Sequence, residues 1–304
     1  MTIPGCVEQK SREESIPDDA IKYTSEMDRF TPVVHNATWN DPEPMPGPVN
    51  TAGGEDACFI TPDGKTFLFF FTPDVTIPHN EQLLDGVTGI WWCQKQDNTW
   101  TEPTRLELGT NIGLDGAPFY QDNRLWFASF RPNNYREDGD IWIATYENDE
   151  WVDIKNAGAL LNGDYNIGEM HLSSDKNTLY FHRESANGSG EYDLFTTTIE
   201  NNTWTEPQNI GYPVSTEKDD SRPFVNEEET ELWFTRPSTL GYTGPAVFRS
   251  VKLPNGTWNE PEEIVSNFAG EPTLDAQGNL YFVHHFFDEE MNMIEADIYV
   301  CYKK

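Results

Sequence analysis

Cys58-Phe59-Ile60-Thr61-Pro62-Asp63-Gly64-Lys65-Thr66-Phe67-Leu68-Phe69 is the stretch of sequence that decides the fold. Two apolar runs flank Asp63-Gly64, a dipeptide typical of the tight turn between two antiparallel strands. The stretch therefore predicts a β-hairpin. Its second strand has four counterparts further along the chain, each consisting of Leu, Trp or Tyr, and Phe: Leu125-Trp126-Phe127, Leu179-Tyr180-Phe181, Leu232-Trp233-Phe234 and Leu280-Tyr281-Phe282.

Each hairpin belongs to a longer repeated unit. A third apolar strand follows the hairpin, as at Asp140-Ile141-Trp142-Ile143, and a segment that starts with Trp follows in most units. A unit of four strands and roughly 50 residues has the length of a propeller blade. The Trp segments recur at intervals of 61, 51, 53 and 54 residues, and they begin at Trp39, Trp100, Trp151, Trp204 and Trp258.

The two ends of the chain predict a closed ring. The fifth unit stops at Lys304 without a Trp segment of its own, whereas the segment at Trp39 precedes the first hairpin. The N-terminal strand should therefore complete the last blade and leave no open sheet edge. We expect an all-β fold, a five-bladed β-propeller with four-stranded antiparallel blades, over residues 31–304. Residues 1–30 are expected to form a flexible N-terminal tether outside it.

Composition and charge exclude several classes of function. The chain has 304 residues, 52 of them acidic and 20 basic, which gives a formal charge of −32. Nucleic acid is therefore excluded as a partner, because a polyanion would be repelled. Hydrophobic residues make up 37% of the chain, which is enough for a packed core. No apolar run is long enough for a transmembrane helix, and we expect a monomer.

The N-terminus carries a short signal of its own. Ile3-Pro4-Gly5-Cys6, followed by a polar run, resembles the cleavage box of a bacterial or archaeal lipoprotein. That resemblance implies a lipid anchor at Cys6, a signal peptide already removed, and a location at the cell surface. The alternative is a plain polar tail on a secreted protein.

The repeated motifs resemble the TolB-type, WD-like propeller family of bacterial and archaeal envelope proteins. The resemblance implies a binding platform without catalysis, whose partner is a polar small molecule, a glycan or an envelope protein. Gly89 and Ala246 depart from the pattern, since the family has Asp at the start of the third strand. The matching segments are Thr61-Pro62-Asp63-Gly64-Lys65, Leu179-Tyr180-Phe181, Arg131-Pro132, Asp140-Ile141-Trp142 and Pro48-Val49-Asn50-Thr51.

Acidic residues recur where the innermost strand of each unit begins. Because inner strands of a propeller start at one rim of the central channel, we expect these side chains to gather there, in one ring or in two tiers. Basic residues end the second strands at the same rim, so the predicted mouth of the channel carries both positive and negative charges. The acids are Glu55, Asp56, Asp115, Glu169, Asp219, Asp220 and Glu271, and the basic residues are Arg131, Arg183, Arg236 and His284 or His285.

Two structural roles for these residues stay open at this point. The basic residues could pair with the acid that opens the next strand of their own blade, as Arg131 with Asp140, Arg183 with Asp193, and His285 with Asp297. The crowded acids could instead bind a cation, Ca²⁺ or Na⁺, or waters in the channel. The sequence does not single out a set of metal ligands.

The preferred function is a non-catalytic, cell-surface or secreted propeller that binds its ligand at the acidic mouth. The expected ligand-binding residues are Glu55, Asp115, Glu169, Asp220, Glu271, Arg183, Arg236 and His284.

The alternative function is an inverting glycoside hydrolase of the five-bladed arabinanase or xylosidase type. That group has an Asp base on its first blade, an Asp modulator on the second and a Glu acid on the third. Asp56, Asp115 and Glu169 follow the same order here, and they would be the catalytic residues. Whether the protein is an enzyme is therefore left open by the sequence.

Overall fold

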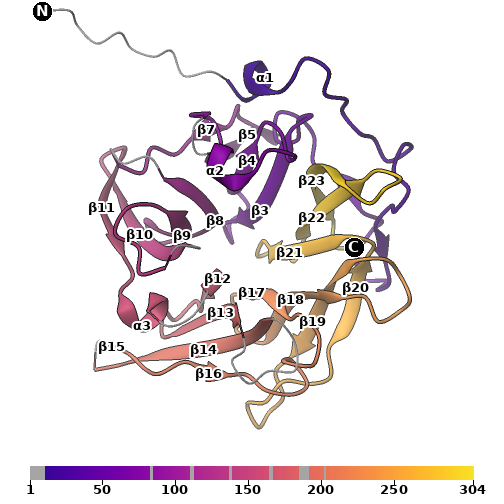
Figure 1. The fold of residues 1–304 in the computed structure, drawn as a ribbon. Helices are drawn as coiled ribbons and strands as arrows, with labels where there is room; N and C mark the ends of the chain where they lie inside the picture. The colour runs from indigo at the N-terminus through magenta and orange to yellow at the C-terminus, as the bar shows by residue number, and fades with distance from the viewer. Residues whose placement is uncertain are drawn as a thin grey trace, which may run out of the picture.

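The computed structural model describes residues 11–82, 85–109, 113–136, 139–163, 167–184, 192–201 and 203–304. Their strands form five antiparallel blades arranged around one axis (Figure 1), so the predicted five-bladed propeller is confirmed. Blade one contains β3 (Gly54–Ile60), β4 (Thr66–Thr72), β5 (Gly89–Gln96), β6 (Thr99–Trp100) and β7 (Thr104–Arg105); blade two contains β8 (Leu114–Gln121), β9 (Arg124–Phe130), β10 (Asp140–Glu147) and β11 (Glu150–Asn156).

The remaining blades repeat this order from the axis outward. The described helices are single turns: α1 (Arg12–Ser15), α2 (His79–Gln82) and α3 (Ala159–Asn162). None of them is long or apolar enough to cross a membrane. Blade three contains β12 (Ile167–Leu172), β13 (Thr178–Glu184), β14 (Tyr192–Glu200), β15 (Thr203–Trp204) and β16 (Gln208–Asn209); blade four contains β17 (Ser221–Val225), β18 (Glu231–Pro237), β19 (Pro245–Val251) and β20 (Glu262–Ser266); blade five contains β21 (Ala269–Leu274), β22 (Leu280–Phe287) and β23 (Met293–Cys301).

The N-terminal region closes the ring, as the sequence predicts. Strand β2 (Glu43–Pro44) pairs antiparallel with β23 of blade five, and Trp39 pairs with Lys303. An additional strand, β1 (Val33–Val34), pairs with β20 and covers the outer edge of blade four. Blade four therefore gains an outer strand that the repeat did not predict.

The first predicted hairpin is formed by β3 and β4. Gly64 has a φ of 68°, which favours glycine, and Asp63 accepts a hydrogen bond from the Lys65 backbone N at 3.1 Å. Thr61 donates to the same carboxylate at 2.7 Å, so the local sequence itself holds the turn.

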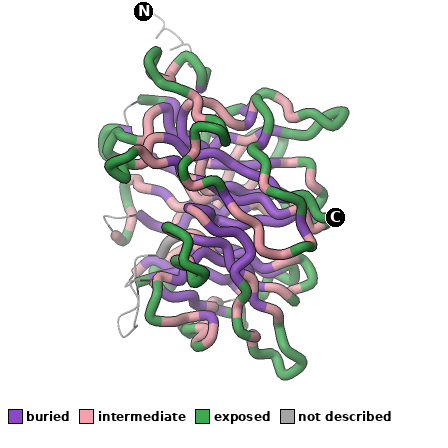
Figure 2. The backbone as a smooth tube through the Cα atoms, turned by 90° about the vertical axis from the view of Figure 1, so that its right-hand side faces the viewer, coloured by how far each residue is buried: buried purple, intermediate pink, exposed green. Residues whose placement is uncertain are grey.

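The repeated aromatic positions fill the core between blades. Phe69, Phe127, Phe181, Phe234 and Phe282 are all fully buried. Figure 2 shows that buried residues occupy the interior and exposed ones the loops. Burying one such side chain contributes about 1.5–3 kcal/mol. The packing therefore fixes the blades relative to one another and gives the axial residues a rigid support.

Residues 11–30, here called the N-terminal strap, lie against the propeller. The Arg12 guanidinium is buried, donates to Glu55 at 3.1 Å and to the Val49 carbonyl at 2.9 Å, and lies over the rings of Phe69 and Phe71. A buried carboxylate needs such a partner. The described part of the expected tether thus packs on blade one instead of standing outside the fold, while the boundary at residue 30 stays a prediction.

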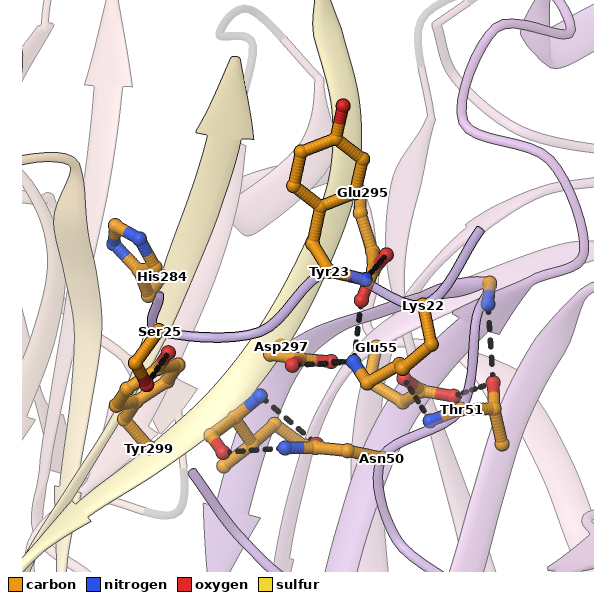
Figure 3. A network of polar contacts seen from close by, with 12 residues as sticks. Lys22, Tyr23, Ser25, Asn50, Thr51, Glu55, His284, Glu295, Asp297 and Tyr299 are labelled. Carbon is orange, nitrogen blue, oxygen red and sulfur yellow. Dashed lines mark hydrogen bonds and ion pairs between the residues drawn. The ribbon is translucent and has the colours of Figure 1, made fainter. Parts of the chain in front are cut away.

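The strap also binds blade five (Figure 3). Lys22 forms ion pairs with Glu295 and with Asp297, the latter at 2.5 Å, and the Tyr23 backbone N donates to Glu295 at 2.9 Å. Both carboxylates are buried. The predicted pairing of His285 with Asp297 is wrong, because Lys22 takes that place.

Candidate functional site

A β-bulge interrupts the inner strands on their way along the axis. Ala57, Ala117, Arg222 and Glu271 have φ values of 46°, 49°, 55° and 57°, and the strand register shifts at each of them. A bulge inserts one residue and turns the side chains around it toward new directions. The acids that the sequence aligned in one place therefore divide into two groups.

The first group stands two residues before the bulge residue and is structural. Glu55 pairs with Arg12 of the strap, Asp115 with Arg131, and Asp220 with Arg236 at 2.5 Å. All three carboxylates are buried, and burial raises the pKa of Glu55 and of Asp220 against the opposing charge of their arginine partners. These predicted ligand-binding residues hold loops and strands together.

The second group meets at the axis and consists of Asp56, Glu169, Arg222, Glu271 and His285. It draws on blades one, three, four and five. The Arg222 Nε lies 3.1 Å from Glu169 Oε1 and 2.6 Å from Glu271 Oε1. The His285 Nε2 lies 3.6 Å from Asp56 Oδ1. We call this group the axial cluster.

The axial cluster shifts the pKa values of its carboxyl groups in opposite directions. Burial opposes ionisation of Asp56, but the contact with His285 and the Arg222 charge outweigh it and hold its pKa well below the ordinary value. Burial raises the pKa of Glu169 and, further reinforced by the charges of Asp56 and Glu169, that of Glu271. One carboxyl group with a lowered pKa and two with raised pKa values therefore belong to the same cluster.

Exposure distinguishes the three carboxyl groups. The side chains of Asp56 and Glu169 keep 34% and 24% of their surface, whereas that of Glu271 keeps 4%. Only the first two are therefore open to a molecule that enters from solvent.

Two cavities adjoin the axial cluster. The larger, 620 Å³, has Asp56 and Phe70 in its wall, and residues 75–78, Asn80 and Gln82, between β4 and β5, border it. The smaller, 40 Å³, runs between the inner strands beside Glu169, Arg222 and Glu271. Its volume suits a few waters, while the larger cavity is wide enough for a small ligand.

Asp56, Glu271 and His285 bring ligand atoms within 4.8 Å of one another. Both oxygens of Glu271 already have partners, since Oε1 contacts Arg222 and Oε2 accepts from the Ala57 backbone N at 2.6 Å. A cation would have to compete with the guanidinium for the same oxygen. The expectation of Ca²⁺ or Na⁺ in the channel stays a prediction.

The remaining predicted basic residues have separate places. Arg131 contacts Asp115 and not Asp140, so that predicted pair is wrong. Arg183 is buried with its guanidinium 3.9 Å from the Phe195 ring centroid. His284 binds Asp28 of the strap at 3.0 Å, away from the axial cluster.

Arg222 is the residue of the axial cluster that the sequence did not predict. The predicted acids stand at strand starts, whereas Arg222 occupies the bulge itself. A usable signal was present, because proline directly follows the bulge residue at Ala117-Pro118, Arg222-Pro223 and Glu271-Pro272. Proline inside a strand is typical of such an irregularity.

Comparison with known proteins finds solved structures of similar fold. No family model matches the sequence, and no curated protein is similar to it at a significant level. The catalytic domain of an α-L-arabinofuranosidase of family GH62 from Coprinopsis cinerea is similar in structure, with a TM-score of 0.54, 12% identity, and coverage of 88% of this chain and 97% of that one. An α-L-arabinofuranosidase from Podospora anserina, in complex with cellotriose, is also similar in structure. Its TM-score is 0.51 and its sequence identity 12%, and the match covers 86% of this chain and 95% of that one.

These similarities correct two expectations. The structural neighbours are five-bladed glycoside hydrolases and not members of the TolB-type family, so that assignment is wrong. The preference for a non-catalytic binding platform depended on it and is overturned with it. The alternative, a glycoside hydrolase, is the better supported of the two functions. At this low sequence identity, the similarity itself shows only the fold.

Proposed function

We propose that the protein is a glycoside hydrolase of the inverting type, in which Asp56 is the general base and Glu169 the general acid. The observation that carries the proposal is the axial cluster itself, where a carboxyl group with a lowered pKa, in the wall of the 620 Å³ cavity, and one with a raised pKa, beside the 40 Å³ cavity, come together. Hydrolysis with inversion needs one group of each kind.

The proposed acid and base keep two of the three residues that the sequence suggested. Asp115 is left out, because Arg131 and the Ser129 hydroxyl hold its carboxylate. Besides the proposed acid and base, the charged residues of the axial cluster are therefore Glu271, Arg222 and His285, and not Asp115. Arg222 contacts the proposed acid, and it would keep the side chain in place and limit the rise of its pKa.

The reaction would use a water on Asp56. The ionised carboxylate removes a proton from that water as it attacks the anomeric carbon, and Glu169 gives its proton to the leaving oxygen. Phe70, Ile77 and Met293 offer apolar surface in the larger cavity, which suits the face of a sugar ring. With a charge of −32, a neutral polysaccharide is the expected substrate.

The location of the protein is also a proposal. A cell-surface or secreted enzyme would meet such polysaccharides outside the cell. Cys6, the expected anchor point, lies outside the described residues.

Sugar release from arabinan, arabinoxylan and xylan tests the proposal. We expect reducing sugar from at least one of them, and its loss in Glu169→Gln and Asp56→Asn. Glu147→Gln and Asp122→Asn, made at exposed positions, are the matched controls and should retain activity. An active Glu169→Gln variant would contradict the assignment of the acid.

A further inference from the structure

A third cavity, in addition to the two beside the axial cluster, opens at the opposite end of the inner strands. It has a volume of 230 Å³ and is bordered by the strand ends at Ile60, Tyr120, Leu172, Val225 and Leu274. The axial cluster belongs to the starts of the same strands, and the 40 Å³ cavity beside it shares Phe59, Phe119, His171 and Phe224 with this one, so these four side chains lie between the two sites. A cavity of about 150 Å³ already holds a benzene ring, and this one therefore has room for a substituted ring.

The floor of this cavity is an aromatic group around one histidine. The His171 ring centroid lies 4.4 Å from that of Phe224, 4.5 Å from that of Phe119 and 6.1 Å from that of Phe59. The four residues come from four different blades. Such a floor favours an apolar, flat group.

His171 presents an unused donor in that floor. Its Nδ1 accepts a hydrogen bond from the Val225 backbone N at 3.3 Å, so Nδ1 has no hydrogen and Nε2 carries it. The side chain is 92% buried, and burial lowers its pKa to about 3, which keeps the ring neutral. Among the described residues, Nε2 has no hydrogen-bond partner. A ligand oxygen would supply one.

An unused acceptor lies in the wall of the same cavity. The Gln121 amide donates weakly to the Ser173 and Ser174 carbonyls, at 3.5 and 3.4 Å. Its Oε1 is buried without a hydrogen-bond partner in the part of the chain that the structure describes. A buried acceptor left unpaired costs about 1–3 kcal/mol, which a ligand hydroxyl would recover in part.

The rim of the cavity favours a positive charge. Glu227 and Glu228 are exposed there on the turn after β17, and Lys303 stands on the same rim. Arg249 also borders the cavity, but Glu231 and Glu262 already bind it. Glu227 lies two residues after Val225, whose backbone N fixes His171, so a short alkylamine on the ring suits this rim.

We infer that this cavity binds a small hydroxyaryl alkylamine, with the ring on the Phe59, Phe119 and Phe224 floor, the hydroxyl between His171 and Gln121, and the ammonium at Glu227 and Glu228. This binding does not depend on the proposed hydrolase activity.

Three matched probes test each part of the inference by ligand-observed NMR titration of the full chain. Tyramine should bind, phenethylamine should bind about threefold or more weaker because it lacks the hydroxyl, and 3-(4-hydroxyphenyl)propionate should bind at least about tenfold weaker because its charge is reversed. Equal binding of all three probes, or none by tyramine at millimolar concentration, would overturn the inference.

Two variants locate the binding. Ser174→Trp, at an exposed rim position, should block tyramine, and Glu227→Gln with Glu228→Gln should weaken it about three- to fivefold. Asp56→Asn should leave tyramine binding unchanged, which separates this site from the axial cluster. Unchanged binding in Ser174→Trp, with the fold intact by circular dichroism, would contradict the proposed place.

Discussion

The Arg222 guanidinium on blade four lies 3.1 Å from the Glu169 carboxyl group on blade three. This contact joins the inner strands of two neighbouring blades, and it brings a positive charge next to the group that we propose as the acid. Because the guanidinium also contacts Glu271 at 2.6 Å, it balances the negative charge that the acids of three other blades bring to one point.

Arg222→Met should shift the pH dependence of hydrolysis to higher pH. The Arg222 charge lowers the pKa of Glu169 and of Asp56, so its loss raises both. The limb of kcat/KM that requires a protonated acid and the limb that requires an ionised base should both move upward. Arg222→Lys keeps the charge and should move them less. A kcat/KM profile against pH that Arg222→Met leaves in place would contradict this role.

Asp115→Asn separates the structural acids from the axial cluster. The change leaves Arg131 buried without its ion partner and should destabilise the fold by about 3 kcal/mol or more. At a temperature where the variant is folded, kcat should stay within about threefold of the original value, since Asp115 is not part of the axial cluster. Urea unfolding and sugar release measure the two effects. A folded variant that has lost kcat would restore Asp115 to the reaction.

Arg12→Ala should destabilise the protein strongly although it lies in the N-terminal strap. The change leaves the buried Glu55 unpaired and removes the contacts with Phe69 and Phe71, at a cost of about 3–5 kcal/mol. Arg12→Met combined with Glu55→Gln should recover part of that loss. Arg29→Ala, at an exposed position of the strap, is the control and should change little. Equal urea midpoints for Arg12→Ala and Arg29→Ala would show that the strap is not anchored.

Asp297→Asn should flatten the fall of stability with pH. Burial, opposed by Lys22, raises the pKa of Asp297 to about 8, compared with about 3.9 in an unfolded chain. Between these two values the folded state binds more protons, so the wild-type free energy of unfolding should decrease as pH rises from about 4 to 8. The variant lacks the titrating carboxyl group, so its free energy of unfolding should decrease less over this pH range. Urea unfolding at several pH values measures both slopes, and identical slopes would contradict the pKa.

The fold was readable from local sequence signals. Asp63-Gly64 fixes a hairpin turn, and the five aromatic second strands fix the number of blades, because both depend on residues close together in the chain. The closing strand followed from counting Trp segments, with Trp39 as the extra one.

The division of the acids could not be read in the same way. Asp56 and Glu55 are neighbours in sequence, yet the bulge at Ala57 sends one to the axis and leaves the other with Arg12. The pairs of Arg12 with Glu55 and of Lys22 with Asp297 join residues 43 and 275 positions apart. No local pattern encodes such contacts, so the strap was expected to be free.

The anomeric form of the first product tests the central claim most directly. Proton NMR during cleavage of an arabinose- or xylose-containing substrate should show the anomer opposite to that of the bond cleaved, formed by the original chain and by Asp122→Asn but not by Asp56→Asn. Retention of configuration, or inverted product from Asp56→Asn at the original rate, would contradict it.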